Sequence, residues 1–192
     1  SNQDTITIDG KVQRKSPPAK VYWLLNKPDF TLVSHTPQDD MQTIYELSSL
    51  KKMPFRLNTV GRLDFRTEGL LLLSNDGELI NELSHPKNQV PRVYQVLVNK
   101  PLTKETLKKV NEEGTTLKDG KVRCNVIRVQ KQKLGTSSGV WYQVTVREGR
   151  NRLIRRLFES LESKVIRLVR VCYGDVILPT DLKPGNCRAL SS

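Results

Sequence analysis

The stretch GRLDFRTEGLLLLSNDG, residues 61–77, decides the fold. Its centre, Gly69 to Ser74, is an apolar run of strand length, and it predicts a strand buried on both faces. The turn signal Asn75-Asp76-Gly77 closes this strand. On its other side, a polar segment places one carboxylate, Asp64, between two arginines at the entrance to the strand. Loops seated on a rigid element are where functional side chains concentrate.

The segments around this strand predict an α+β fold, with a mixed, mostly antiparallel sheet and flanking helices. Residues 93–98 alternate, with Tyr94, Val96 and Val98 on one face. Further strands are expected at 21–26, 121–130, 140–147 and 165–173. Further helices are expected after Gly77, at 103–113, at 151–161, and after an N-cap at Asp39-Asp40, with Met41, Ile44, Tyr45 and Ser48 on one face. The polar stretch 131–139, KQKLGTSSG, is typical of a mobile hairpin loop.

The net charge of +12 over 192 residues is distributed unevenly. Residues 1–100 hold 13 basic and 11 acidic side chains, whereas residues 101–192 hold 19 and 9. A basic excess on one part of a chain favours a polyanion as partner, because each neutralised phosphate releases counterions. Nucleic acid is the favoured partner, and a merely basic soluble protein or an anionic membrane surface are the alternatives. No apolar run approaches the roughly 20 residues of a membrane span.

The sequence lacks the motifs that metal-dependent and nucleotide-dependent enzymes usually carry. Three scattered cysteines and two histidines offer no metal-ligand spacing, so no metal is expected, and an odd number of thiols suits a reducing compartment. Neither a P-loop, nor a dinucleotide-binding glycine motif, nor a Gly-x-Ser-x-Gly elbow occurs. We therefore expect a protein that works without a metal or a bound coenzyme.

The most cationic segment runs from Arg147 to Arg170 and holds seven arginines and one lysine against three glutamates. Arginine is the residue that recognises phosphate or carboxylate in a planar, bidentate way. On the expected helix 151–161 the arginines would form a row beside the apolar stripe. A solvated helix face is the plainer interpretation of such a run. Asp64 taken alone could likewise be a turn-forming or capping residue.

With its neighbours, the segment 61–77 resembles the signature of the pseudouridine synthases, in the Rsu-type branch that acts on ribosomal RNA. Further segments agree with this family in order and spacing from about residue 21 to residue 190. They are Leu24-Leu25-Asn26-Lys27-Pro28, Leu83-Ser84-His85-Pro86, Val93-Tyr94-Gln95-Val96, residues 148–156 (EGRNRLIRR), and Arg167-Leu168-Val169-Arg170 with Gly174. Residues 5–20 are similar to the last strand of a small RNA-binding module that often precedes the catalytic domain. The expected domains are therefore a remnant at 1–20 and a catalytic domain at 21–192.

The resemblance implies isomerisation of a uridine in ribosomal RNA to pseudouridine, with no cofactor. It makes Asp64 the essential carboxylate, places Arg155 against it as a charge partner, and assigns Tyr94 to stacking on the target base. Arg62 would fill the space left by the extruded base, and Ile154 and Leu168 would be apolar walls for the uracil ring. Arg150, Arg152, Arg156 and Arg170 would hold phosphates, and Lys131 and Lys133 could touch RNA further away.

The sequence departs from the family pattern at two positions and leaves alternatives for function and target. Leu153 and Arg152 depart from the family's usual Gln and His or Lys, without touching the residues expected to do the chemistry. A catalytically idle RNA-binding factor in ribosome assembly, on the same scaffold, is the alternative function. The target uridine and the ribosomal subunit are not named by the sequence, with a slight lean to the large subunit. A monomer is expected, in the bacterial cytoplasm or in a bacterial-type organelle.

Overall fold

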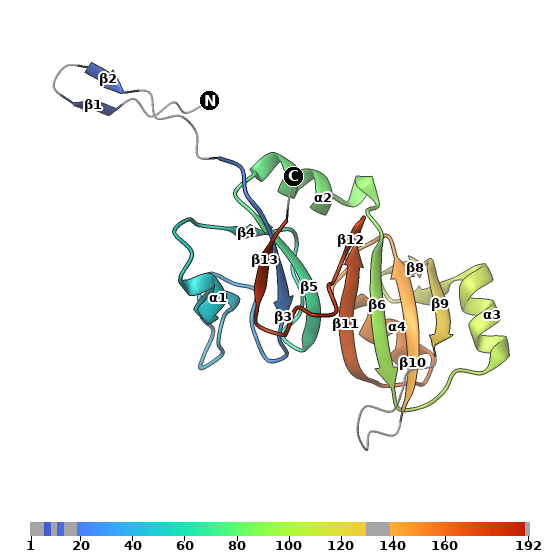
Figure 1. Ribbon diagram of the computed structural model, residues 1–192. Helices are drawn as coiled ribbons and strands as arrows, with labels where there is room; N and C mark the ends of the chain where they lie inside the picture. Colours follow the sequence, from blue (N-terminus) through green and yellow to red (C-terminus); the bar gives the residue numbers. More distant parts are fainter. Residues whose placement is uncertain (1–5, 9–10, 14–18, 130–138, 191–192) are drawn as a thin grey trace.

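The computed structural model describes residues 6–8, 11–13, 19–129 and 139–190. A nine-stranded sheet forms the body of the molecule (Figure 1). Seven strands follow the order β13-β3-β5-β11-β6-β10-β9, with β4 paired to β5 and β12 to β11. The strands are β3 Tyr22–Lys27, β4 Asn58–Thr59, β5 Thr67–Ser74, β6 Arg92–Val98, β9 Cys124–Val129, β10 Val140–Val146, β11 Val165–Tyr173, β12 Val176–Ile177 and β13 Cys187–Ala189.

The sheet is mixed and mostly antiparallel, which confirms the expected class. Within it, β5 and β11 run parallel, with Leu168 opposite Thr67, and the other pairings are antiparallel. This parallel pair joins the β13-β3-β5 part of the sheet to the β11-β6-β10-β9 part. The backbones approach closely there, because a Cβ on Gly69 would lie 2.2 Å from the Arg170 carbonyl oxygen. A side chain at Gly69, whose φ is +101°, would clash with β11, so this position requires glycine.

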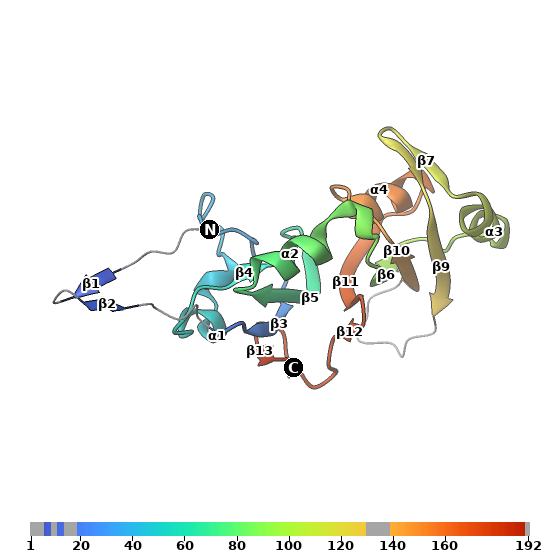
Figure 2. The same ribbon diagram turned by 90° about the horizontal axis from the view of Figure 1, so that it is seen from above.

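Helices and the β7–β8 hairpin flank the sheet, and a second small hairpin, β1–β2, lies apart from it (Figures 1 and 2). The α-helices are α1 Ser48–Lys51, α2 Gly77–Ser84, α3 Lys104–Glu113 and α4 Leu153–Ser160, and the 3₁₀ helices are η1 Ile44–Glu46 and η2 Pro86–Asn88. The hairpins are β1 Ile6–Ile8 with β2 Lys11–Gln13, and β7 Thr115–Leu117 with β8 Gly120–Val122. As expected, α3 is capped by Thr103, whose hydroxyl accepts from the Thr106 amide, and ends at Gly114.

Three expectations about elements are wrong. The helix expected after Asp39-Asp40 is instead η1 followed by one turn of α1, because Thr43 and Glu46 form a capping box that starts the helical backbone later. The helix expected at 151–161 is shorter, since Arg152 adopts a left-handed conformation (φ +48°) before α4. The N-terminal segment holds a two-stranded hairpin in place of a single strand. The expected mobile loop at 131–139 lies almost wholly outside the described residues.

Both faces of β5 are buried, as its apolar run predicts. Leu71 and Leu73 belong to a cluster that packs against Ile44, while Leu70 and Leu72 face the opposite way into a cluster with Tyr173. A third cluster packs α4 onto β10 and β11 through Phe158 and other buried side chains. The loop before β5 is thus anchored to the most buried strand of the molecule. No helix in the described ranges is both long enough and apolar enough to span a membrane.

Candidate active site

Asp64 lies in the loop between β4 and β5 and is half-buried. It lines an open cavity of about 650 Å³, whose walls come from this loop, β6, the segment between β10 and α4, and β11. The loop is tight at this point, since the Thr67 amide donates to the Asp64 carbonyl at 2.9 Å. The carboxylate is therefore held at the rim of a cavity by the start of a rigid strand.

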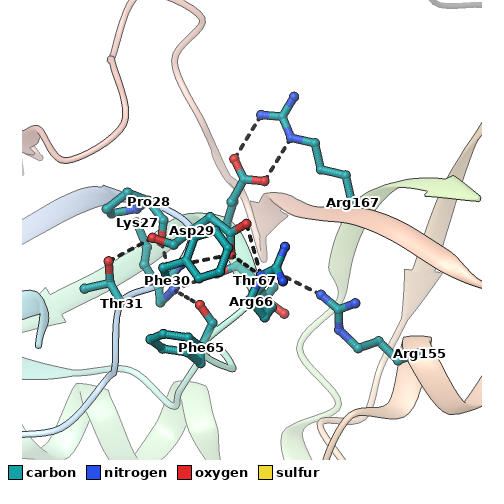
Figure 3. Close-up of polar contacts among 11 residues, drawn as sticks. Lys27, Pro28, Asp29, Phe30, Thr31, Phe65, Arg66, Thr67, Arg155 and Arg167 are labelled. Carbon is teal, nitrogen blue, oxygen red and sulfur yellow. Dashed lines mark hydrogen bonds and ion pairs between the residues drawn. The ribbon is translucent and has the colours of Figure 1, made fainter. Parts of the chain in front are cut away.

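Lys27, at the end of β3, ties this loop to β3 through hydrogen bonds to loop carbonyls (Figure 3). Its ammonium donates to the carbonyls of Pro28 at 2.9 Å, Phe65 at 3.3 Å and Thr67 at 2.8 Å. The side chain is buried, and burial lowers the pKa of Lys27 from 10.5 to about 8. Lys27 belongs to a motif shared with the family but had no predicted role, although a lysine at the end of an apolar strand is a signal in the sequence.

Tyr94 and Asp64 line the same cavity, although they are 30 positions apart in the chain. Tyr94 lies on β6, between Arg170 on β11 and Val144 on β10. Ile154 and Leu168, the two expected apolar walls, are buried and also line the cavity. Arg62 lines it as well, with an exposed side chain. The structure thus brings these five residues together from four separate segments.

Arg155 makes a different contact from the one expected. No nitrogen of Arg155 lies within 4.0 Å of the Asp64 carboxylate in the described structure. Its Nη2 donates instead to the carbonyl of Arg66 at 2.9 Å (Figure 3). Burial lowers the pKa of Arg155 most, and the Arg152 charge lowers it further, while the Asp64 charge opposes both. The Arg155 side chain therefore holds the Asp64 loop by a hydrogen bond to the loop backbone, and the Asp64 carboxylate interacts with its charge from a greater distance.

Of the four arginines expected to hold phosphates, three are paired with a carboxylate or buried. Only Arg152, at the N-terminus of α4, has an exposed side chain. Arg150 and Arg156 both pair with the Asp119 carboxylate of the β7–β8 hairpin, at 3.0 and 2.8 Å. Arg170 is 2% exposed, donates from Nε to the Leu70 carbonyl at 2.9 Å and lies 4.8 Å from the Tyr173 ring. The row of arginines expected on helix 151–161 is not exposed as a whole, because Arg156 pairs with Asp119 and Arg155 is half-buried against the Arg66 carbonyl.

The cavity has further polar residues that the sequence analysis missed. Arg92, at the start of β6, is buried and donates to the Tyr173 hydroxyl at 3.2 Å. Buried side-chain atoms without a hydrogen-bond partner in the described structure are Thr67 Oγ1, Arg155 Nε and Arg170 Nη2, and Thr67 and Arg170 line the cavity. In the described ranges, no three His, Cys, Asp or Glu side chains are grouped as a metal site would need. The described residues that line the cavity carry two carboxylates, Asp64 and Glu148, beside aromatic rings and cationic side chains, and Glu148 is paired with Arg150.

The sequence profile of the RNA pseudouridylate synthase family matches residues 21–160. The chain belongs to this family. It is 37% identical over 195 residues to the ribosomal large subunit pseudouridine synthase B of Bacillus subtilis, covering all of this chain and 75% of that protein. It is 38% identical to an uncharacterized RNA pseudouridine synthase of Aquifex aeolicus, covering 98% of this chain and 72% of the relative. Against the synthase B of Xylella fastidiosa the identity is 36%, and this chain spans only 40% of that protein.

Solved structures of the family have the same fold. A pseudouridylate synthase crystal structure, 28% identical, superposes with a TM-score of 0.73 over 90% of this chain and 71% of that chain. Human RNA pseudouridylate synthase domain containing 1 superposes at 0.59, covering 90% of this chain and 79% of that one, with 12% identity, so it supports the fold alone.

Proposed function

We propose that this chain converts a uridine of ribosomal RNA to pseudouridine, with Asp64 as the essential carboxylate and without a cofactor. The observation that carries the proposal is the convergence of Asp64, Tyr94, Ile154 and Leu168 on one cavity. A carboxylate, an aromatic ring and two apolar walls fit a pyrimidine nucleotide. The named relatives that act on ribosomal large subunits support the class of RNA.

The reaction is an isomerisation in which no atom is gained overall. The bond between C1′ of the ribose and N1 of uracil breaks, the base rotates, and C5 bonds to C1′. C5 then loses its hydrogen as a proton, and N1 gains one. Attack of Asp64 on the sugar or the base, or removal of a sugar proton to give a glycal, would each start this sequence, and each needs an ionised carboxylate beside the glycosidic bond. Tyr94 would stack on the uracil and assist the final deprotonation.

The target base must leave the RNA stack to reach the cavity, at a cost of a few kcal/mol. Arg62 is exposed at the rim, where it would fill the space that the base leaves. Arg152 is exposed and free to meet phosphates. Arg156 would first have to leave Asp119, and Arg150 would have to leave both Asp119 and Glu148. Arg170 is buried, so a phosphate would reach it only within the cavity. Residues 21–192 would act as the catalytic domain, as a monomer in the bacterial cytoplasm, with 1–20 the remnant of an RNA-binding module.

Chemical mapping of pseudouridine tests the proposal. Ribosomal RNA transcripts are incubated with the protein and with Asp64→Ala. We expect the unchanged protein to modify one uridine or a few neighbours, and Asp64→Ala to bind the RNA and leave it unmodified. Turnover by Asp64→Ala would refute the role of this carboxylate. Binding without modification by both proteins would favour an idle assembly factor.

A further inference from the structure

Phe30, in the turn that follows β3, is an exposed aromatic side chain in a conformation unusual for its type. It is 57% exposed, and its backbone has φ +54°. A single exposed apolar side chain is ordinary on a protein surface. A bulky residue in the left-handed region is uncommon, because its Cβ crowds the backbone, and such conformations persist only where the surroundings impose them.

The surroundings of Phe30 impose this conformation by several contacts. The Phe30 amide donates to its neighbour's carboxylate, Asp29 Oδ1, at 2.9 Å. The Thr31 amide donates to the Phe65 carbonyl at 3.3 Å, and the Lys27 ammonium donates to the Pro28 carbonyl on the other side of the turn. The turn is thereby tied to the loop that carries Asp64.

The ring itself is also fixed (Figure 3). The guanidinium of Arg66 lies 4.1 Å from the Phe30 ring centroid, and its Nε donates to both Asp29 oxygens, at 2.9 and 3.2 Å. The Phe65 ring meets Phe30 edge-on at 5.7 Å. Arg66 keeps 49% of its side-chain surface exposed. Phe30 and Arg66 thus form a stack, called here the Phe30–Arg66 platform, and both side chains keep about half of their surface exposed.

The platform lies at the rim of the candidate active site. Phe65 and Arg66 follow Asp64 directly in the chain. Phe65, next to Arg66, lines the cavity, and so do Leu32 and Val33, which follow Phe30 closely in the chain. A base drawn into the cavity leaves its neighbours in the RNA without a stacking partner. Aromatic rings and guanidinium planes are the side-chain groups on which unstacked bases of single-stranded RNA are held.

We propose that the Phe30–Arg66 platform stacks on a nucleobase adjacent to the uridine that enters the cavity. This inference rests on the proposed function, since it assumes an RNA substrate. A single-stranded nucleic acid fits better than an apolar protein partner, because half of the platform is a guanidinium plane paired with Asp29 and the cationic Arg62 is exposed on the same loop. Base stacking is tolerant of sequence, so the platform would hold any base at that position.

The test compares two RNA probes of equal charge: a short fluorescein-labelled oligouridylate, and a strand of the same length with abasic riboses. Binding of each is measured by fluorescence anisotropy for the unchanged protein, Phe30→Ala, Phe30→Trp and Phe55→Ala. Phe55→Ala is the matched control, because Phe55 is a partly exposed phenylalanine outside the cavity lining. We expect Phe30→Ala to bind oligouridylate about tenfold more weakly and the abasic strand unchanged. Phe30→Trp and Phe55→Ala should keep the preference for the base-bearing strand.

Two outcomes would overturn the inference: an unchanged preference in Phe30→Ala, or an equal loss for both strands, which would indicate a purely structural ring. Pseudouridine mapping on ribosomal RNA separates this failure from failure of the proposed function. If the unchanged protein modifies RNA while Phe30→Ala keeps its preference, only the platform fails. If the unchanged protein makes no pseudouridine but Phe30→Ala loses its preference, only the proposed function fails.

Discussion

Lys27 makes the stability of the fold depend on pH. Its pKa is about 8 in the folded chain and 10.5 in the reference state, so the unfolded chain binds more protons between these values. Stability should therefore rise as pH increases from about 8 to about 10.5, by at most about 3 kcal/mol, and this contribution is constant below that window. The check is urea unfolding at a series of pH values, for the unchanged protein and for Lys27→Met.

In Lys27→Met the pH-dependent contribution should disappear. At pH 7 the variant should also be less stable, because the Phe65, Thr67 and Pro28 carbonyls lose their common donor, at about 1–3 kcal/mol for each buried acceptor left unpaired. Parallel curves for the two proteins between pH 8 and 10 would contradict the lowered pKa of Lys27.

Phe30 allows a stability test that is independent of RNA. Phe30→Gly and Phe30→Ala both remove the ring, but only glycine adopts φ +54° without a steric penalty. Phe30→Gly should therefore be more stable than Phe30→Ala by about 1 kcal/mol in chemical unfolding, while both bind RNA equally weakly. If the alanine variant proves the more stable, the left-handed backbone at this position is wrong.

At the scale of elements, the turn of the β7–β8 hairpin supplies the Asp119 carboxylate that pairs with two arginines of the cationic segment. Asp119 accepts from Arg150 and Arg156, and Arg156 is the main cause of the lowered pKa of Asp119. Asp119→Asn should leave the Arg156 guanidinium without a carboxylate partner, whereas Arg150 keeps its pairing with Glu148. RNA should therefore bind more tightly, with a logarithmic salt slope that is steeper by up to about 0.7–0.9, the value for one phosphate contact. The measurement is RNA affinity across a range of salt concentrations.

Asp181→Asn is the control for this prediction. It makes the same change in charge and breaks the pairing of Asp181 with Arg188, outside the cavity lining. The stability cost of either substitution should stay near 1 kcal/mol or less, because both carboxylates are largely exposed. Equal gains in RNA affinity from the two variants would mean that net charge alone is responsible.

The elements that the sequence predicted well are those with a strong local pattern. β11 has the expected bounds at 165–173, and β5 is buried on both faces as its apolar run requires. α4 was predicted too long, because a left-handed residue such as Arg152 leaves the apolar periodicity intact. Asp64 and Tyr94 do meet at one cavity, but the family resemblance was needed to pair them. The pairing of Arg150 and Arg156 with Asp119 could not be predicted. It depends on where the β7–β8 hairpin packs, and no local sequence pattern specifies the position of a hairpin.

At the scale of the whole molecule, the basic excess of residues 101–192 is partly neutralised by internal contacts. Arg150, Arg156 and Arg167 pair with carboxylates, and Arg170 is buried. Arg152 is the exposed member of the predicted set, so Arg152→Ala should lower the logarithmic salt slope of RNA binding by about 0.7–0.9, the value for one phosphate contact. An unchanged slope would show that Arg152 is only a solvated surface residue.

In the proposed reaction, Asp64 drives an isomerisation in which C5 of uracil loses its hydrogen. Ribosomal RNA labelled with tritium at C5 of its uridines tests this role of Asp64, because each uridine converted must release its label into water. With excess protein, we expect release that stops at one or a few tritium atoms for each RNA molecule. With Asp64→Asn we expect no release, although the variant still binds the RNA. Tritium release by Asp64→Asn at the rate of the unchanged protein would refute the role of Asp64.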